Sequence, residues 1–198
     1  MSHALDSQYW NQRIEKADMP WDIGHISTPL KNYIDQLTNK DLAILIPGCG
    51  NSYEAGYLLE NGFTNITVID IAPAQTQKLR EKYAAFVNKT LTVITGNFFD
   101  AQGEYDCILE QTFFCALDPQ QRTNYVLQMH RLLKPGGKLA GVFFNRHFEG
   151  GPPFGGSIAE YETRFSPYFN IHTLAPCTNS IEKRAGTEAF AIFCKKEL

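Results

Sequence analysis

Two glycines and a carboxylate, spaced as in nucleotide-binding sites, carry the first chemical signal in this sequence. Gly48 and Gly50 stand in "ILIPGCGNS", directly after the apolar run 42–46. Glycine permits a tight turn and allows a ligand to approach the main chain closely. Asp70 follows twenty positions after Gly50, at the end of a second apolar run, where an acidic side chain can accept hydrogen bonds from a ribose. The alternative is a plain turn with a helix-capping aspartate, since Pro73 opens the next helix.

The positions that follow indicate which nucleotide fits. A diphosphate-binding turn usually carries a third glycine, but Tyr53 stands at that position here. Asn97 follows the third apolar run, Glu110 ends the fourth, and none of the four strand exits carries a lysine or arginine. Such a polar to acidic pocket suits a cation better than a phosphate. The sequence therefore favours S-adenosylmethionine, which has a ribose, an adenine, an amino group and a sulfonium but no phosphate.

Strand-like and helix-like segments alternate along the chain, and this alternation positions the turn. The expected strands are 42–46, 66–70, 91–95, 105–110 and 138–144, with weaker candidates at 168–175 and 187–195. The run "LAILI" is continuously apolar, as in a strand that is covered on both faces. Right-handed strand–helix–strand crossovers predict a parallel sheet with helices on both faces. Ligands of such sheets bind beyond the carboxyl ends of the strands, where the glycine turn lies.

Length and composition limit the function classes. The chain has 198 residues and a net charge of -3, which favours one domain over 1–198 and gives no basic stretch for a nucleic-acid partner. The apolar runs are strand-sized, so we expect no membrane span, and the polar first residues do not resemble a signal peptide. Five cysteines without a Cys/His cluster predict no disulfide framework, no metal site and a cytoplasmic location. A monomer is the simplest expectation.

Six stretches carry a resemblance to a known family. They are "YWNQRIEKADMPWDIGHISTPL", "ILIPGCGNSYEAGYL", "VIDIAPAQ", "YDCILEQTFFCALDP", "HRLLKPGGKL" and "GGPPF", and together they cover most of residues 9–160. The chain resembles the thiopurine methyltransferase superfamily, most closely its thiol and halide methyltransferases. The resemblance implies a three-layer α/β sandwich of the Rossmann-like class I methyltransferase type, with a mainly parallel seven-stranded sheet and an antiparallel last strand. Residues 1–40 are then a helical cap over the cofactor, and 145–165 form the loop and helix of the acceptor site.

The turn and the resemblance together name the expected cofactor contacts. These are Trp10, Trp21, Gly48, Cys49, Gly50, Asp70, Ile71, Asn97, Phe98, Glu110 and Gln111. Trp10 and Trp21 are the only tryptophans, and an indole face attracts a cation such as a sulfonium. Packing of a helix onto the sheet is the alternative for both. Some relatives carry a further tryptophan at Ile14.

Most of the acceptor candidates follow the fourth or the fifth expected strand, and one more lies near the end of the chain. They are Phe113, Phe114, Arg146, His147, Phe154 and Arg184. The two phenylalanines of "TFF" line an apolar pocket or belong to the core. His147 is a possible base or a solvated surface residue, Arg146 or Arg184 is expected to hold an anion, and Phe154 belongs to the lid "EGGPPFGG". We interpret the adjacent Cys115 as a small buried residue, because direct methyl transfer needs no covalent step.

The expected reaction is direct displacement of a methyl group from S-adenosylmethionine, with S-adenosylhomocysteine as product. The acceptor is a small soft nucleophile: a thiol, a thiopurine, sulfide or halide, or a selenium or tellurium species. No residue is assigned as a general base, since a thiol is already partly ionised at neutral pH. Two alternatives remain open, a non-catalytic module that binds S-adenosylmethionine and, less favoured for want of a third glycine, an NAD(P)-dependent oxidoreductase.

Overall fold

Seven strands form one sheet whose order places β1 between β2 and β4. The computed structural model describes residues 5–197; residues 1–4 and 198 lie outside the description. The strands are β1 (Ile44–Pro47), β2 (Ile66–Asp70), β3 (Leu91–Thr95), β4 (Tyr105–Gln111), β5 (Leu133–Phe144), β6 (Phe169–Pro176) and β7 (Glu188–Lys195). Their order is β3-β2-β1-β4-β5-β7-β6, and among these strands β7 alone runs opposite to the others, antiparallel to both β5 and β6. The expected seven-stranded, mainly parallel sheet with an antiparallel last strand is confirmed.

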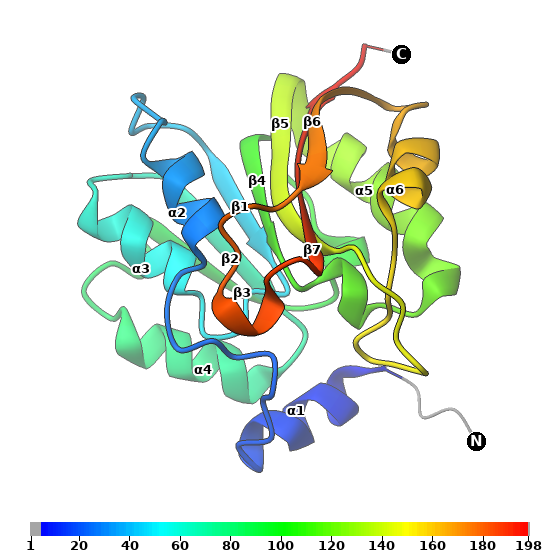
Figure 1. Cartoon of the computed structure of the whole chain (residues 1–198). Coiled ribbons are helices and arrows are strands. Elements are labelled where there is room, and N and C mark those ends of the chain that lie inside the picture. Colours follow the sequence, from blue (N-terminus) through cyan, green and yellow to red (C-terminus); the bar gives the residue numbers. More distant parts are fainter. Residues whose placement is uncertain (1–4, 198) are drawn as a thin grey trace.

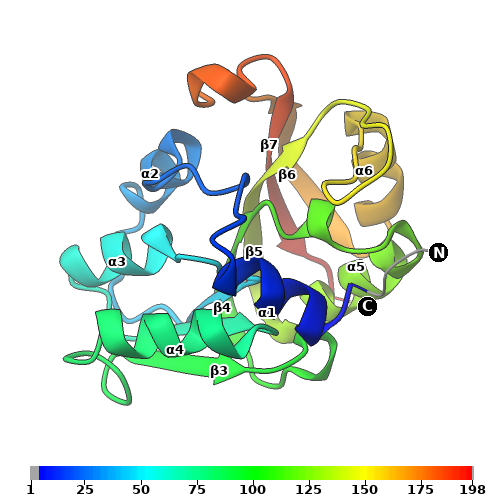
Figure 2. The same cartoon turned by 90° about the horizontal axis from the view of Figure 1, so that it is seen from below.

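Helices cover both faces of this sheet (Figure 1). They are α1 (Ser7–Glu15), α2 (Thr28–Ile34), α3 (Tyr53–Glu60), α4 (Pro73–Lys82), α5 (Arg122–Leu132) and α6 (Ile158–Phe165). α2, α3 and α4 lie on one side, α5 and α6 on the other, and α1 lies across one end of the sheet (Figure 2). Within residues 5–197, the structure has no helix of the length and apolar character that crossing a membrane requires.

Alternate strand residues feed two separate apolar cores, as the two-residue period of a strand requires. On β1, Leu45 packs with the core under α5 and α6, while Ile44 and Ile46 pack with the core under α2, α3 and α4. On β4, Ile108 faces the first core and Leu109 the second. This burial on both faces explains why the inner strands are continuously apolar. It also means that neighbouring residues at a strand's end point in opposite directions.

Some element boundaries differ from the sequence prediction. The apolar and polar pattern after Pro73 predicts a helix over 73–87, but the helix ends at Lys82, because Tyr83 leaves helical geometry with φ -111° and ψ 27°. The fifth strand starts at Leu133 rather than 138, because Leu133 pairs with Tyr105 of β4. The segment after residue 118 begins as a single 3-10 turn, η3 (Pro119–Gln121), before α5. None of these shifts moves a strand exit.

Strand order reverses between β1 and β4, and the chain leaves both strands at the same edge of the sheet. Crossovers from β1 lead to β2 and β3 on one side, and later strands add on the other side. Open α/β sheets bind ligands at this kind of switch point. The glycine turn follows β1 directly, and the segment "TFF" follows β4, so the topology brings these two loops together.

Candidate active site

A cavity of about 1040 Å³ lies at the switch point, beyond the carboxyl ends of the parallel strands. Its walls come from the N-terminal cap, the exits of β1 to β5, and the turn η4 (Glu182–Arg184) before β7. Most of the sequence-predicted site residues line it: Trp10, Trp21, Gly48, Cys49, Gly50, Asp70, Ile71, Asn97, Phe98, Gln111, Phe113, Arg146 and Arg184. Glu110, Phe114, His147 and Phe154 are not among the lining residues.

The glycine turn takes left-handed backbone geometry at both glycines. φ is +55° at Gly48 and +49° at Gly50, values that residues with a Cβ adopt rarely. A Cβ at Gly48 would lie 2.2 Å from Cδ2 of Phe113, whereas a Cβ at Gly50 would meet no atom within 4 Å. Gly48 is therefore required by an aromatic ring of the protein itself, as well as by its φ. This contact adds a third reason for glycine to the two that the sequence suggested, a tight turn and close approach of a ligand.

Asp70 fixes this turn to the exit of β2. The main-chain N–H of Gly50 donates to Oδ2 at 3.1 Å, and the N–H of Ala72 donates to Oδ1 at 2.9 Å. Burial raises the pKa of the Asp70 carboxyl, and these main-chain donors oppose the rise. Asp70 lines the cavity, and each of its carboxylate oxygens can accept a further hydrogen bond. Asp70 can therefore accept hydrogen bonds from a diol while it holds the turn.

Two amide side chains lie at the next strand exits. Oδ1 of Asn97 accepts the N–H of Phe99 at 3.1 Å and so caps the turn η1 (Phe98–Asp100), which leaves its Nδ2 as a donor. Oε1 of Gln111 is buried and has no hydrogen-bond partner among the described residues. An acceptor buried without a partner is unfavourable in the protein alone. Gln111 lines the cavity, and its buried amide oxygen lacks a partner inside the protein, so rotation of the amide toward the cavity would pair it with a ligand amino group.

The two indoles of the cap meet over the cavity. The ring centroids of Trp10 and Trp21 lie 5.5 Å apart at an interplanar angle of 80°. The Arg13 guanidinium already lies over Trp21, with Cζ 4.8 Å from the ring centroid. One face of the Trp21 indole is therefore already occupied by a cation of the protein, whereas Trp10 contacts the aromatic rings of Tyr9 and Trp21.

Polar contacts tie the cap to the strand exits. Ser7 Oγ donates to the main-chain oxygen of Ile71 at 2.8 Å, beside Asp70. Oδ2 of Asp22 accepts Nδ2 of Asn51 at 2.6 Å and the hydroxyl of Tyr53 at 3.2 Å, beside the glycine turn. These contacts were not predicted, although Asp22 stands in the segment "PWDIG" that the resemblance includes. They place the cap on the same two loops that hold the cofactor candidates.

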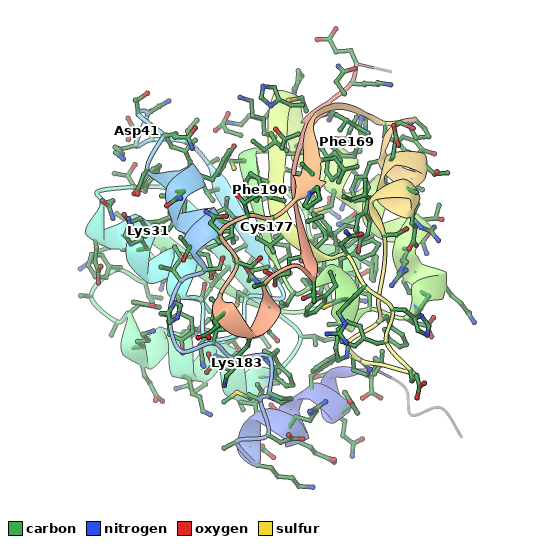
Figure 3. All side chains as sticks on the ribbon, viewed as in Figure 1. Lys31, Asp41, Phe169, Cys177, Lys183 and Phe190 are labelled. Atoms are coloured by element: carbon green, nitrogen blue, oxygen red, sulfur yellow. The ribbon has the colours of Figure 1, made fainter. Side chains whose placement is uncertain are left out.

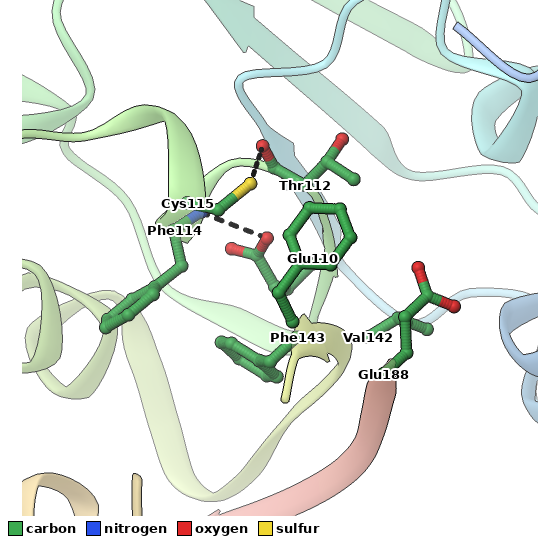
Figure 4. Close-up of a pocket in the computed structure, with 8 residues that line it drawn as sticks. Glu110, Thr112, Phe114, Cys115, Val142, Phe143 and Glu188 are labelled. Atoms are coloured by element: carbon green, nitrogen blue, oxygen red, sulfur yellow. Dashed lines mark hydrogen bonds between the residues drawn. The ribbon is translucent and has the colours of Figure 1, made fainter. Parts of the chain in front are cut away.

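Glu110 lies beneath the cavity rather than in its wall. It is 0% exposed, and its carboxylate accepts the main-chain N–H of Phe113 at 2.7 Å and of Phe114 at 3.2 Å, and the hydroxyl of Tyr125. Burial raises its pKa to about 7. Figure 4 shows the carboxylate beside the main chain of Phe114. Glu110 therefore shapes the β4 exit from within and has no direct path to a cofactor.

That exit contains an unusual residue. Thr112 has φ +59°, a conformation that a β-branched residue adopts rarely, and its main-chain oxygen accepts Sγ of Cys115 at 3.2 Å. Burial raises the pKa of the Cys115 thiol well above its ordinary value. Phe114 is 2% exposed and packs in the core against Tyr125. Cys115 is thus a protonated structural residue, and of the two phenylalanines only Phe113 reaches the cavity.

The exit of β5 forms the opposite wall. Phe144, Phe148, Pro152 and Pro153 line it, together with Arg146. His147 lies outside the wall, and Phe154 instead donates its main-chain N–H to the oxygen of Cys115 at 2.7 Å. This end of the cavity is aromatic and cationic, in contrast to the polar end at Asp70.

A buried arginine, Arg122, is bonded to the loop after β5 on the side away from the cavity wall. Nη2 of Arg122 donates to the oxygen of Gly155 at 2.6 Å, and Nη1 pairs with Glu160 at 2.8 Å. Sequence reasoning missed Arg122, because nothing local relates a residue of α5 to the loop after β5. Within residues 5–197, no group of three or more His, Cys, Asp or Glu side chains is placed to hold a metal ion, and all five cysteines are free thiols.

Comparisons with known proteins identify the family and agree with the fold. Residues 5–197 match the sequence model of a family described as thiopurine S-methyltransferase (TPMT). A probable thiol methyltransferase 2 of Arabidopsis thaliana is 28% identical over 162 residues, covering 80% of this chain and 71% of the relative. Thiocyanate methyltransferase 1 of Brassica oleracea is 28% identical over 185 residues, covering 90% and 81%. The Burkholderia thailandensis 1,6-didemethyltoxoflavin-N1-methyltransferase, solved with S-adenosylhomocysteine, has a TM-score of 0.73 at 16% identity, covering 96% and 87%.

Proposed function

This chain belongs to the thiopurine S-methyltransferase family, and we propose that it transfers the methyl group of S-adenosylmethionine to a small, soft, anionic acceptor. The observation that carries the proposal is the two-ended cavity. One end presents Asp70, Asn97 and Gln111, and the other presents aromatic rings with Arg146. A volume of about 1040 Å³ exceeds that of a typical site for one drug-sized ligand and leaves room for two reactants.

The residues at the polar end fit S-adenosylmethionine. Asp70 would accept the ribose hydroxyls, and Nδ2 of Asn97 would donate to the adenine edge. The unpaired Oε1 of Gln111 would accept the amino group of the methionine part. The indole of Trp10 would face the sulfonium, for which an aromatic face is a suitable neighbour. These assignments retain the expected cofactor contacts except Glu110.

The proposed reaction is an in-line displacement at a methyl carbon. S-adenosylmethionine would supply this methyl group on a positively charged sulfur. The acceptor's lone pair would form the new bond to the methyl carbon while the bond between that carbon and the sulfonium breaks. The electron pair of the broken bond would stay on the sulfur, which becomes a neutral thioether. An anionic acceptor and a cationic donor give a neutral methylated product and S-adenosylhomocysteine. Positioning both reactants in one cavity could lower the barrier by up to about 7–11 kcal/mol. No protein nucleophile is required, in line with the buried thiol of Cys115.

The cap and the exit of β5 are assigned to different ligands, the cofactor and the acceptor. We assign the segment 1–40 to enclosing the cofactor and 145–165 to forming the acceptor wall, within one domain over 1–198. Tethering of the cap beside Asp70 and beside the glycine turn supports the first role. The rings and prolines at the cavity wall support the second.

The partner is a small molecule, and we infer a cytoplasmic monomer without a nucleic-acid partner. A net charge of -3 gives no electrostatic basis for binding a phosphate backbone. Five free thiols suit a reducing compartment. Sedimentation at micromolar concentration tests the monomer.

Calorimetry with S-adenosylhomocysteine, followed by an acceptor screen with labelled S-adenosylmethionine, tests the proposed function. The screen contains thiocyanate, iodide, hydrosulfide, small thiols and a thiopurine, with volatile and soluble products counted separately. We expect tight binding, methylation of at least one soft anion, and loss of binding by about a hundredfold in Asp70→Ala. Binding without transfer to any acceptor favours the non-catalytic alternative. NAD(P)H binding without S-adenosylhomocysteine binding favours the oxidoreductase.

A further inference from the structure

Two arginines, Arg146 and Arg184, border the acceptor end of the cavity. They differ in whether a carboxylate lies beside the guanidinium. Nη1 of Arg184 lies 3.3 Å from Oε1 of Glu188, and the two side chains are 12% and 5% exposed. Nη2 of Arg184 donates to the main-chain oxygen of Trp21 at 2.8 Å. The charge of Arg184 is thus balanced by a buried carboxylate, and its donors are partly used. Arg184 is a weak candidate for holding a further anion.

Arg146 has the opposite character. Among residues 5–197 no carboxylate oxygen lies within 4.0 Å of its guanidinium, and the group makes no hydrogen bond to another side chain or to the main chain. Its Cζ lies 4.6 Å from the ring centroid of Phe148, which contacts Phe144 edge-on at 4.9 Å between centroids. All three side chains line the cavity. The exit of β5 therefore contributes a positive charge without a paired carboxylate, with an aromatic surface beside it.

Arg146 is an exposed residue, but its main chain is fixed, so the point from which its side chain extends is defined. The N–H of Gly156 donates to the oxygen of Arg146 at 3.1 Å in an antiparallel bridge. A Cβ at Gly155 would lie 2.2 Å from the same oxygen. Ile158 N–H donates to Oδ1 of Asn145 at 3.2 Å, which anchors the neighbouring residue to the start of α6. The glycine pair of the loop thus permits a close backbone approach that holds Arg146 at the wall.

From these contacts we propose that Arg146 is the specificity-determining residue that binds the negative charge of the acceptor. A guanidinium is weakly hydrated and planar, and the adjoining rings favour polarisable groups, so the site selects soft anions over neutral acceptors of similar size. Thiolates, thiocyanate and iodide share this chemistry. This inference rests on the proposed function, because the anion must lie in the same cavity as the methyl donor.

The test measures anion binding and turnover in Arg146→Met and Arg146→Lys against Lys78→Met. Lys183 on η4 also lines the cavity (Figure 3), so the control is Lys78, an exposed cation of α4 that is not among the lining residues and loses the same single charge when replaced. Thiocyanate and iodide are titrated into the complex with S-adenosylhomocysteine. Methyl transfer is then measured to thiocyanate, a permanent anion, and to dimethyl sulfide, a neutral acceptor. The dissociation constant of S-adenosylhomocysteine is measured for every variant.

We expect Arg146→Met to weaken thiocyanate binding and raise its KM about tenfold, with an intermediate effect in Arg146→Lys and a change below about twofold in Lys78→Met. Affinity for S-adenosylhomocysteine and any transfer to dimethyl sulfide should stay within about twofold. If the wild-type protein binds S-adenosylhomocysteine but neither anion, this inference is overturned and the proposed function is not. An equal loss in Lys78→Met overturns the inference as well. Failure to bind S-adenosylhomocysteine overturns the proposed function instead.

Discussion

Arg184 and Trp21 join the two ends of the chain across the cavity. Nη2 of Arg184 donates to the main-chain oxygen of Trp21 at 2.8 Å, although 163 positions separate the two residues. Trp21 in turn contacts the ring of Trp10. The turn before β7 therefore holds the indole pair of the cap in place, which gives Arg184 a positioning role distinct from anion binding.

Removing this link should loosen the cap without unfolding the sheet. Replacement of Arg184 alone would leave the Glu188 carboxylate buried and unpaired, which costs about 3–5 kcal/mol. We therefore expect the double variant Arg184→Met with Glu188→Gln to bind S-adenosylhomocysteine about tenfold more weakly by calorimetry.

Glu188→Gln alone is the matched control, since it keeps the bond from Arg184 to Trp21. Its affinity should stay within about threefold of the wild type. Equal losses in the single and double variants would show that the link to Trp21 contributes nothing to cofactor binding.

Trp10 should distinguish the charged donor from the neutral product. Arg13 already covers the Trp21 ring at 4.8 Å, so a sulfonium would lie nearer the Trp10 face. Trp10→Leu should weaken S-adenosylmethionine binding about tenfold and S-adenosylhomocysteine binding less, because a cation–π contact is worth about 0.5–2 kcal/mol. Trp10→Phe keeps an aromatic face and should recover part of the difference. An identical loss for both ligands would assign Trp10 to packing alone.

Gly48 and Gly50 should respond unequally to alanine. Both have positive φ, which costs a residue with a Cβ about 1–2 kcal/mol. Only at Gly48 would the new methyl group meet Phe113, and overpacking adds about 1–3 kcal/mol. Urea unfolding should therefore show a larger loss of the free energy of unfolding for Gly48→Ala than for Gly50→Ala.

A double-mutant cycle isolates the steric part of that loss. Phe113→Ala removes the ring, so Gly48→Ala in that background should destabilise by no more than Gly50→Ala does in the wild type. If the ring's removal leaves the effect of Gly48→Ala unchanged, the contact between Gly48 and Phe113 is not what requires glycine.

The sequence predicted the fold and the polar end of the cavity because both depend on local patterns. Apolar runs defined the strands, and the rule that ligands bind at strand exits brought Gly50 and Asp70 together, where the structure has a hydrogen bond of 3.1 Å. The tryptophan cap came from the resemblance rather than from periodicity. Its tether to Arg184 lay beyond sequence reasoning, because it joins segments that are distant in the chain and differ in secondary structure.

Glu110 shows the limit most clearly. Glu110 and Gln111 are adjacent at the end of β4, so the strand's two-residue period turns them to opposite faces. Nothing in the local sequence tells which of them faces the cavity. The structure turns Glu110 toward Tyr125 in the core under α5, and leaves Gln111 at the cavity with an unpaired oxygen.

Glu110 should also give the protein a pH dependence of unusual sign. Burial raises its folded-state pKa to about 7 from an ordinary value of 4.5. Between these values the folded state binds more protons than the unfolded state, so the contribution of Glu110 to the free energy of unfolding falls as pH rises. The contribution is fully present below the unfolded pKa and lost by the time pH passes the folded pKa.

The comparison of wild type with Glu110→Gln isolates this effect from other titrating groups. The difference in the free energy of unfolding, wild type minus variant, should fall by up to about 3 kcal/mol between pH 4.5 and pH 7, since a tenfold change in a proton-binding constant is worth about 1.4 kcal/mol. Urea unfolding in steps of half a pH unit measures it. Glu54 is also buried, with a pKa raised to about 7, so Glu54→Gln serves as a parallel control. It should remove the contribution of Glu54 to the pH dependence and leave that of Glu110 unchanged. A difference that rises with pH across this window would mean that the three donors from Phe113, Phe114 and Tyr125 outweigh burial and keep Glu110 ionised in the folded protein.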